Sequence, residues 1–279
     1  MLTSEECIRQ FVHEYSVKLA KVTLKGYENS IRQMLSICDK SFDEITIHDI
    51  RNWLIHLDES GYKSSSIKTK LFGLHLFYQY CREEGYLNYH PVEGIPLPKD
   101  EDKLPKYLTY EELAQLRLLS EGNLKIRAVI EVLYTTGVRI SELINMKLDD
   151  INWEERMVRI PTGKGKKERI VLFTRDCAEH VEAYLKTRSD SLPFVFLDRF
   201  GTGPIGYYSV LYWFGMYGEK LDILLTPHVL RHTFAAHMAI KGMPMHFIQA
   251  ILGHENPNNT QIYARLHSQA QKQMYDEWM

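Results

Sequence analysis

Cysteine is scarce in this chain of 279 residues, and its four copies are scattered. They are Cys7, Cys38, Cys81 and Cys177, and no two of them are spaced as Cys-x-x-Cys. This spacing argues against a zinc site and against a disulfide framework. We therefore expect reduced thiols in a cytoplasmic protein.

Long apolar runs and leader segments are lacking as well. No stretch of about 18 uncharged apolar residues occurs, so we expect no membrane span. The first six residues contain neither a basic region nor an apolar region, so we expect no signal peptide. The metal-binding pattern His-Glu-x-x-His is also missing, because His13-Glu14 is followed by no histidine at position 17. We expect neither a metal nor another cofactor.

The chain has no excess of positive charge. Lys and Arg number 34, Asp and Glu number 36, and the formal net charge is -2. Nucleic-acid-binding proteins are often basic overall, so this balance counts mildly against DNA as a partner. A local basic face can still bind phosphates while acidic residues elsewhere balance the total. The hydrophobic content of 44% and charged content of 25% are those of a soluble globular protein.

Residues 1–90 predict a small helical bundle. Apolar residues recur at helical spacing in four stretches joined by short connections. Ser4 opens the first stretch, Thr23 can cap the second, Thr46 or His48-Asp49 begins the third and Ser64 begins the fourth.

Residues 91–106 predict a linker between two domains. Prolines recur there among acidic and basic residues, at Pro91, Pro96, Pro98 and Pro105. Proline removes a helix donor, and mixed charge keeps an extended segment solvated.

Residues 107–279 predict a second domain, mostly helical with one strand-rich patch. Thr109 and Glu112 have the spacing of a helix-capping box. Residues 157–160 and 168–172 are strand-like and flank a basic, glycine-containing turn at 162–167, and residues 194–196 are a further short extended segment. The fold class that we expect is mainly α, in two domains, with a small antiparallel β-sheet.

Six polar side chains of this second domain have a pattern suited to phosphate chemistry. They lie in five local motifs, of which the third contains two of them: Thr-Gly-Val-Arg-Ile-Ser-Glu, Gly-Lys-Gly-Lys, His-Val-Leu-Arg, Leu-Gly-His and Gln-Ile-Tyr. Arginine stays charged and donates two hydrogen bonds to phosphate oxygens, and a tyrosine beside such a site is a candidate nucleophile. The six residues are Arg139, Lys164, His228, Arg231, His254 and Tyr263.

Each of these motifs has an ordinary structural alternative. Arg139 and Glu142 could be a surface ion pair worth tenths of a kcal/mol, on the order of 0.2–0.5. Lys164 could be a solvated hairpin tip, and Tyr263 is one of 17 tyrosines. His232 and His237 lie near the histidine–arginine motif without a matching role, and we interpret them as packing or surface residues. The order and spacing of the whole set decide against the alternatives.

This set of motifs resembles the tyrosine recombinases, or phage integrase family, and most closely their Xer-like members. The resemblance covers nearly the whole chain. It implies an N-terminal, SAM-like core-binding domain that helps to encircle DNA, and a catalytic domain of the DNA breaking-rejoining fold.

The resemblance also implies roles for the six residues. Tyr263 would attack a phosphodiester and form a 3′-phosphotyrosyl link, and Arg139 and Arg231 would hold the non-bridging oxygens. His228 would accept the tyrosine proton, and His254 would hydrogen-bond the phosphate. Lys164 would donate a proton to the leaving 5′-oxygen.

The resemblance implies partners as well. These are double-stranded DNA and further copies of the chain, with a homotetramer on two DNA sites and a monomer or weak oligomer when free. Candidate DNA-binding residues are the hydroxyls and lysines that open the fourth helix and the lysines of the basic turn, namely Ser64, Ser65, Lys68, Lys70, Lys166 and Lys167. Two alternatives stay open: a type IB topoisomerase-like enzyme that relaxes DNA, and a non-catalytic DNA-binding protein.

Overall fold

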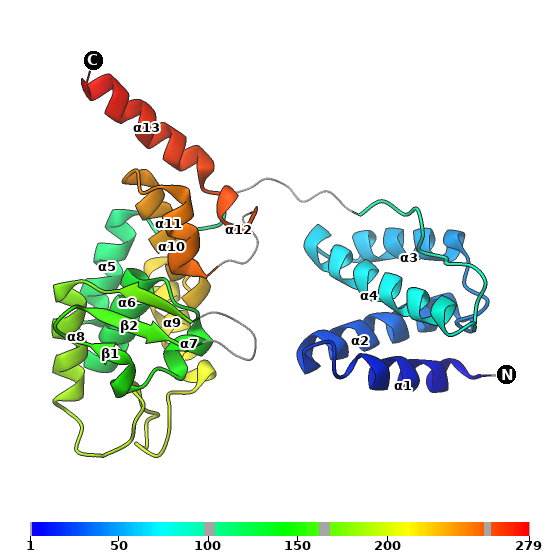
Figure 1. Ribbon diagram of the computed structural model, residues 1–279, viewed down its shortest axis with the longest axis horizontal. Coiled ribbons are helices and arrows are strands. Elements are labelled where there is room, and N and C mark those ends of the chain that lie inside the picture. The colour runs from blue at the N-terminus through cyan, green and yellow to red at the C-terminus, as the bar shows by residue number, and fades with distance from the viewer. Residues whose placement is uncertain (1, 98–103, 162–167, 254–257, 279) are drawn as a thin grey trace. The chain divides into compact units, whose positions relative to one another are not determined.

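The chain divides into two compact units, Met1–Glu101 and Asp102–Met279 (Figure 1). The computed structural model describes residues 2–97, 104–161, 168–253 and 258–278. Each unit has a hydrophobic core of its own.

The first unit is the expected bundle of four helices: α1 (Ser4–Tyr15), α2 (Lys21–Cys38), α3 (Ile47–Glu59) and α4 (Ser64–Glu83). Helix α4 packs against each of the other three. Large side chains fill the space between them, and Phe11, Trp53 and Phe77 are at most 1% exposed.

Side-chain caps mark two of the four helix starts in this unit, those of α1 and α3. Thr46 caps α3 in a reciprocal arrangement with Asp49, and α4 begins at Ser64 as predicted. The predicted cap at Thr23 is wrong. Helix α2 begins three residues earlier than that cap implies, after Ala20, which has no side chain able to cap it. Thr23 therefore lies in the first turn of the helix.

The second unit is mainly helical and carries a small sheet. Its helices are α5 (Tyr110–Ser120), α6 (Leu124–Thr136), α7 (Ile140–Ile144), the 3-10 turn η1 (Leu148–Asp150), α8 (Arg175–Leu185), α9 (Tyr207–Leu221), α10 (Pro227–Ile240), α11 (Met245–Leu252), α12 (Asn258–Gln261) and α13 (Ala264–Trp278). Helix α6 is buried along most of its length and packs against α5, α8 and α10.

The sheet has three antiparallel strands in the order β1 (Ile151–Asn152), β2 (Met157–Ile160) and β3 (Arg169–Leu172). Val158 pairs with Val171, and both side chains are buried in the core. This confirms the predicted antiparallel sheet. Strand β1 was not predicted, because two residues are too few to show an alternating pattern. The segment at 194–196 forms only an isolated bridge, between Phe194 and Lys147.

Helix α10 is the element around which the candidate site is built. Thr226 caps it and Pro227 occupies its first turn, so its start is fixed by sequence. It packs against α6, α9, α11 and α13. Helix α13, red in Figure 1, contacts α10 and buries Leu266 and Ala270. Its apolar side therefore packs, at least in part, within its own chain.

Gly137, between α6 and α7, is required by its conformation and by its neighbours. Its φ is +62°, and a Cβ there would lie 2.7 Å from Cδ1 of Phe234 and 3.0 Å from Cδ2 of Leu252. We expect Gly137→Ala to lower the free energy of unfolding by about 1–3 kcal/mol, from strain and overpacking. Calorimetry should show a melting temperature lower by about 2–4 °C for each kcal/mol lost.

The matched control is Gly215→Ala in α9, where an added Cβ meets no atom within 4 Å. Because alanine favours a helix interior over glycine, this control should melt at the original temperature or slightly higher. An unchanged melting temperature for Gly137→Ala would contradict the expectation.

Candidate active site

Arg231 is the most deeply buried of the predicted site residues on α10. Its side chain is held from two sides: Nη1 donates to the carbonyl of Gly137, and Nη2 donates to the carbonyl of Leu252 at 2.6 Å. Burial and the nearby charge of Arg139 lower the pKa of Arg231 to about 10, which still leaves it charged at neutral pH. The guanidinium of Arg231 therefore provides a positive charge that is held in one position and largely shielded from water.

Arg139 lies at the start of α7, as predicted, and is more accessible. Its side chain is 43% exposed. Nη1 donates to Glu142 at 3.0 Å and Nη2 donates to the carbonyl of Gly253 at 2.9 Å. Gly253 directly follows Leu252, so the two predicted arginines meet at neighbouring carbonyls although 92 positions separate them in sequence.

Tyr263 is buried beside α10 rather than exposed to solvent. It is 1% exposed, and its hydroxyl is hydrogen-bonded to Nδ1 of His232. Burial raises the pKa of Tyr263, and the charge of Arg231 opposes that shift. The phenol is therefore protonated at neutral pH in this arrangement, and it needs a base before it can act as a nucleophile.

His232 is the residue that sequence reasoning misjudged. We interpreted it as a packing or surface residue, and the structure places it against the hydroxyl of Tyr263. Its ring also packs edge-on against that of His228, with centroids 4.3 Å apart. The signal was present: His228 and His232 are four residues apart on one helix, so they share a face.

His228 has the electrostatics expected of a base. Burial lowers the pKa of His228 below its ordinary value, and the positive charges of Arg231 and Arg139 lower it further. Its imidazole is therefore neutral at neutral pH and able to accept a proton.

Four predicted residues, His254, Lys164, Lys166 and Lys167, lie outside the described residues.

In the first unit, the structure brings two of the predicted DNA-binding residues to one hollow. Ser65 and Lys70 of α4 line it together with Val22, Thr23 and Gly26 of α2. Hydroxyl and ammonium groups are donors suited to phosphate oxygens. The other two candidates in this unit, Ser64 and Lys68, are on the same helix but do not line the hollow.

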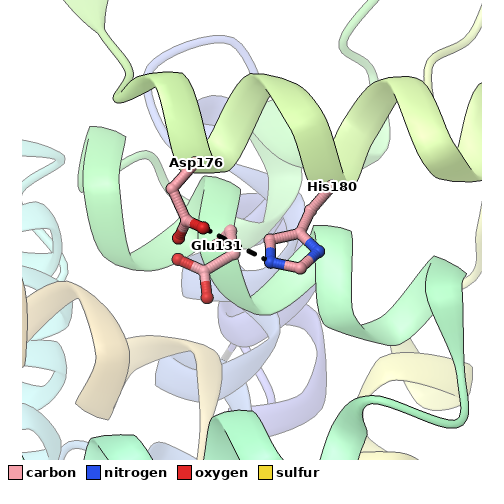
Figure 2. A group of neighbouring side chains, drawn as sticks. All are labelled: Glu131, Asp176 and His180. Carbon is pink, nitrogen blue, oxygen red and sulfur yellow. Dashed lines mark ion pairs between the residues drawn. The ribbon is translucent and has the colours of Figure 1, made fainter.

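One group of potential metal ligands occurs among the described residues, and it lies on α6 and α8 (Figure 2). The ligand atoms of Glu131, Asp176 and His180 lie within 4.8 Å of one another. Glu131 already accepts hydrogen bonds from Arg117, at 2.8 and 2.6 Å, and from Arg127 at 3.0 Å. Two guanidinium groups bind the Glu131 carboxylate that a cation would need, so this buried carboxylate belongs to an ion-pair network with Arg117 and Arg127.

Family models match both units. The model described as "Phage integrase family" matches residues 106–270, and "Phage integrase, N-terminal SAM-like domain" matches residues 8–86. The chain belongs to the phage integrase family. It is a site-specific tyrosine recombinase of the Xer-like type, and so an enzyme, as the sequence predicted.

Relatives extend over most of the chain. Tyrosine recombinase XerD of Halalkalibacterium halodurans is 32% identical, with 99% of this chain and 98% of the relative covered. Tyrosine recombinase XerA of Pyrococcus horikoshii is 33% identical, covering 86% of this chain and 84% of the relative.

Solved structures of a recombinase and an integrase agree with the fold. A crystal structure of XerA recombinase matches with a TM-score of 0.57 at 29% identity, covering 98% of each chain. The Tn1549 transposon integrase in complex with transposon right end DNA matches with a TM-score of 0.80 at 21% identity, covering 97% of this chain and 99% of that one. In the part of this recombinase that the structure describes, no helix is long and apolar enough to cross a membrane.

Proposed function

We propose that this recombinase cuts and rejoins double-stranded DNA through a 3′-phosphotyrosyl intermediate formed by Tyr263. The observation that supports this most is the meeting of Arg139 and Arg231 at the adjacent carbonyls of Gly253 and Leu252. Two guanidinium groups held together can bind the non-bridging oxygens of one phosphodiester and stabilise the charge that grows during attack.

The proposed chemical step is a transesterification. The oxygen of Tyr263 forms a bond to phosphorus, and the bond from phosphorus to the 5′-oxygen breaks. The phenolic proton passes to the histidine pair, in which Nδ1 of His232 is hydrogen-bonded to the hydroxyl and His228 is neutral. Lys164 supplies a proton to the departing 5′-oxygen, and His254 hydrogen-bonds the phosphate.

Rejoining reverses this step with a 5′-hydroxyl from a partner duplex. The covalent link conserves the energy of the phosphodiester, so neither ATP nor water takes part. Two duplexes cut on two strands each require four active sites, so we propose a homotetramer on two DNA sites and a monomer or weak oligomer when free. We place this reaction in the cytoplasm.

The hollow between α2 and α4 is the proposed DNA contact of the first unit. Its lining residues include Ser65, Thr69 and Lys70 and no acidic side chain. Ser64 and Lys68 on the same helix, and Lys166 and Lys167 after β2, would add phosphate contacts along the duplex.

The direct test of this function uses DNA flanking the gene of the protein. Duplex fragments from that region are incubated with the protein, and covalent protein–DNA junctions are isolated under denaturing conditions and sequenced. We expect junctions at one defined position on each strand, with protein on the 3′-phosphate. Junctions on the 5′-phosphate, or none at any fragment, would contradict the proposal.

Cleavage is expected to proceed at an unchanged rate in excess EDTA. The arginines already supply the positive charge that a metal ion would bring to the phosphate. The measurement is the rate of covalent adduct formation with and without chelator. Loss of cleavage on chelation, restored by added magnesium or zinc, would overturn this mechanism.

A further inference from the structure

Three arginines converge on the end of α11. Nε of Arg169 donates to the carbonyl of Ile251 at 2.8 Å, Nη2 of Arg231 donates to that of Leu252 at 2.6 Å, and Nη2 of Arg139 donates to that of Gly253 at 2.9 Å. The last carbonyls of a helix have no partner within the helix and carry partial negative charge. Cationic donors therefore stabilise this end of the helix, and each of the three arginines donates a hydrogen bond to one of three successive carbonyls.

Arg169, on β3, donates to protein groups from all three of its nitrogens, whereas Arg139 and Arg231 each do so from Nη1 and Nη2. Beyond the bond to Ile251, its Nη1 and Nη2 both donate to Glu142, at 2.9 and 2.7 Å. The side chain is only 11% exposed. Because Nε, Nη1 and Nη2 all donate to protein groups, Arg169 is poorly placed to bind a phosphate itself.

Glu142 joins Arg169 to Arg139. Oε1 accepts from Nη1 of both arginines, while Oε2 accepts from Nη2 of Arg169 and from the backbone N–H of Arg139 at 2.7 Å. Burial acts to raise the pKa of Glu142, but the hydrogen bonds from Arg169 and from the backbone of Arg139 outweigh it and lower the pKa to about 2. The carboxylate is ionised throughout the working pH range.

Arg169 also packs closely against the turn after α11. An added Cβ on Gly253 would lie 3.1 Å from Cδ and 3.1 Å from Nη1 of Arg169. The φ of Gly253 is +62°, a conformation that glycine adopts without strain. The guanidinium therefore fixes this turn by contact as well as by hydrogen bonding.

We propose that Arg169 is a positioning residue that sets Arg139 for phosphate binding by holding Glu142 and the end of α11 in one place. The inference rests on the proposed role of Arg139 at the scissile phosphate. It assigns Arg169 no contact with DNA.

The test compares Arg169→Met with Arg169→Lys in the full chain, using single-turnover cleavage of a nicked substrate. Displacing a binding group by about 1 Å can cost on the order of 100-fold in rate, so we expect cleavage by Arg169→Met to slow by about 10- to 100-fold. Affinity for a one-site duplex should stay near that of the original protein, because Arg169 makes no proposed contact with DNA. Lysine should restore only part of the rate, because its single ammonium group cannot replace a planar guanidinium that donates hydrogen bonds from several nitrogens at once.

The pH profile separates positioning from a general structural role. Without Arg169 its two hydrogen bonds to Glu142 are lost while those from Arg139 remain, so the effect of burial on Glu142 is opposed less strongly and its pKa rises. Glu142 then becomes protonated as the pH falls, and cleavage by Arg169→Met should drop further below that of the original protein between pH 7 and pH 5.

The matched control is Arg188→Met, which removes an arginine with 9% side-chain exposure, bonded to Asp190 and to the carbonyls of Leu192, Phe194 and Val195. Its cleavage rate per folded molecule should be unchanged at every pH.

Two results would overturn the inference. One is cleavage by Arg169→Met within about twofold of the original rate, and the other is a rate ratio that does not vary with pH. The proposed function is still supported after either result, provided that Tyr263→Phe forms no covalent adduct. If Tyr263→Phe does form one, the proposed function itself fails.

Discussion

Tyr263→Phe is expected to abolish covalent attachment of this recombinase to DNA. The substitution removes only the nucleophilic oxygen, so one-site DNA binding should stay near its original affinity. The measurement is a suicide substrate resolved on a denaturing gel, together with a native gel shift. A loss of covalent product below detection, with the native shift retained, is the expected result.

The matched control is Tyr217→Phe, another buried tyrosine of the same unit, on α9. Its hydroxyl has no proposed part in the reaction, so cleavage should be unchanged. Tyr263→Phe also removes the hydrogen bond to His232, which contributes about 1 kcal/mol to stability, and thermal melting should confirm that the variant is folded at the assay temperature. A denaturation-resistant DNA adduct of Tyr263→Phe would mean that another side chain is the nucleophile.

Much of the fold could be predicted because local signals were strong. The capping pairs at Thr46–Asp49 and Thr109–Glu112 and the helical apolar spacing mark where helices begin. Strands β2 and β3 alternate buried and exposed residues, which is a pattern visible in sequence. The errors lie where no local signal exists, as at the uncapped start of α2 and in the two-residue strand β1.

The candidate site was predictable as a set of residues but not as an arrangement. Motif order and spacing predict Arg139, Arg231 and Tyr263 as site residues, and this assignment stays a prediction. The role of His232 against Tyr263, and that of Arg169 between Glu142 and Ile251, depend on contacts between positions 31 and 82 residues apart. Such pairs are formed by tertiary packing, and nothing in the local sequence of β3 distinguishes Arg169 from a surface arginine.

Arg231→Ala and Arg139→Ala are each expected to slow cleavage by about 10²- to 10³-fold, the usual loss when one donor to a developing oxyanion is removed. Lysine at either position should recover little of the rate, because it cannot make the bidentate contact to phosphate. The rates are measured at saturating DNA in single turnover. The control Arg188→Ala should cleave at the original rate per folded molecule.

The two variants should differ in stability although their catalytic losses are similar. Arg231 is 3% exposed and satisfies the carbonyls of Gly137 and Leu252, so its removal leaves buried acceptors unpaired at about 1–3 kcal/mol each. Arg139 is largely accessible, and water can replace its bonds. We therefore expect a clear fall in melting temperature for Arg231→Ala and a small one for Arg139→Ala. If both variants cleaved at close to the original rate per folded molecule, the arginines would be structural residues, and the phosphate site would have to lie elsewhere.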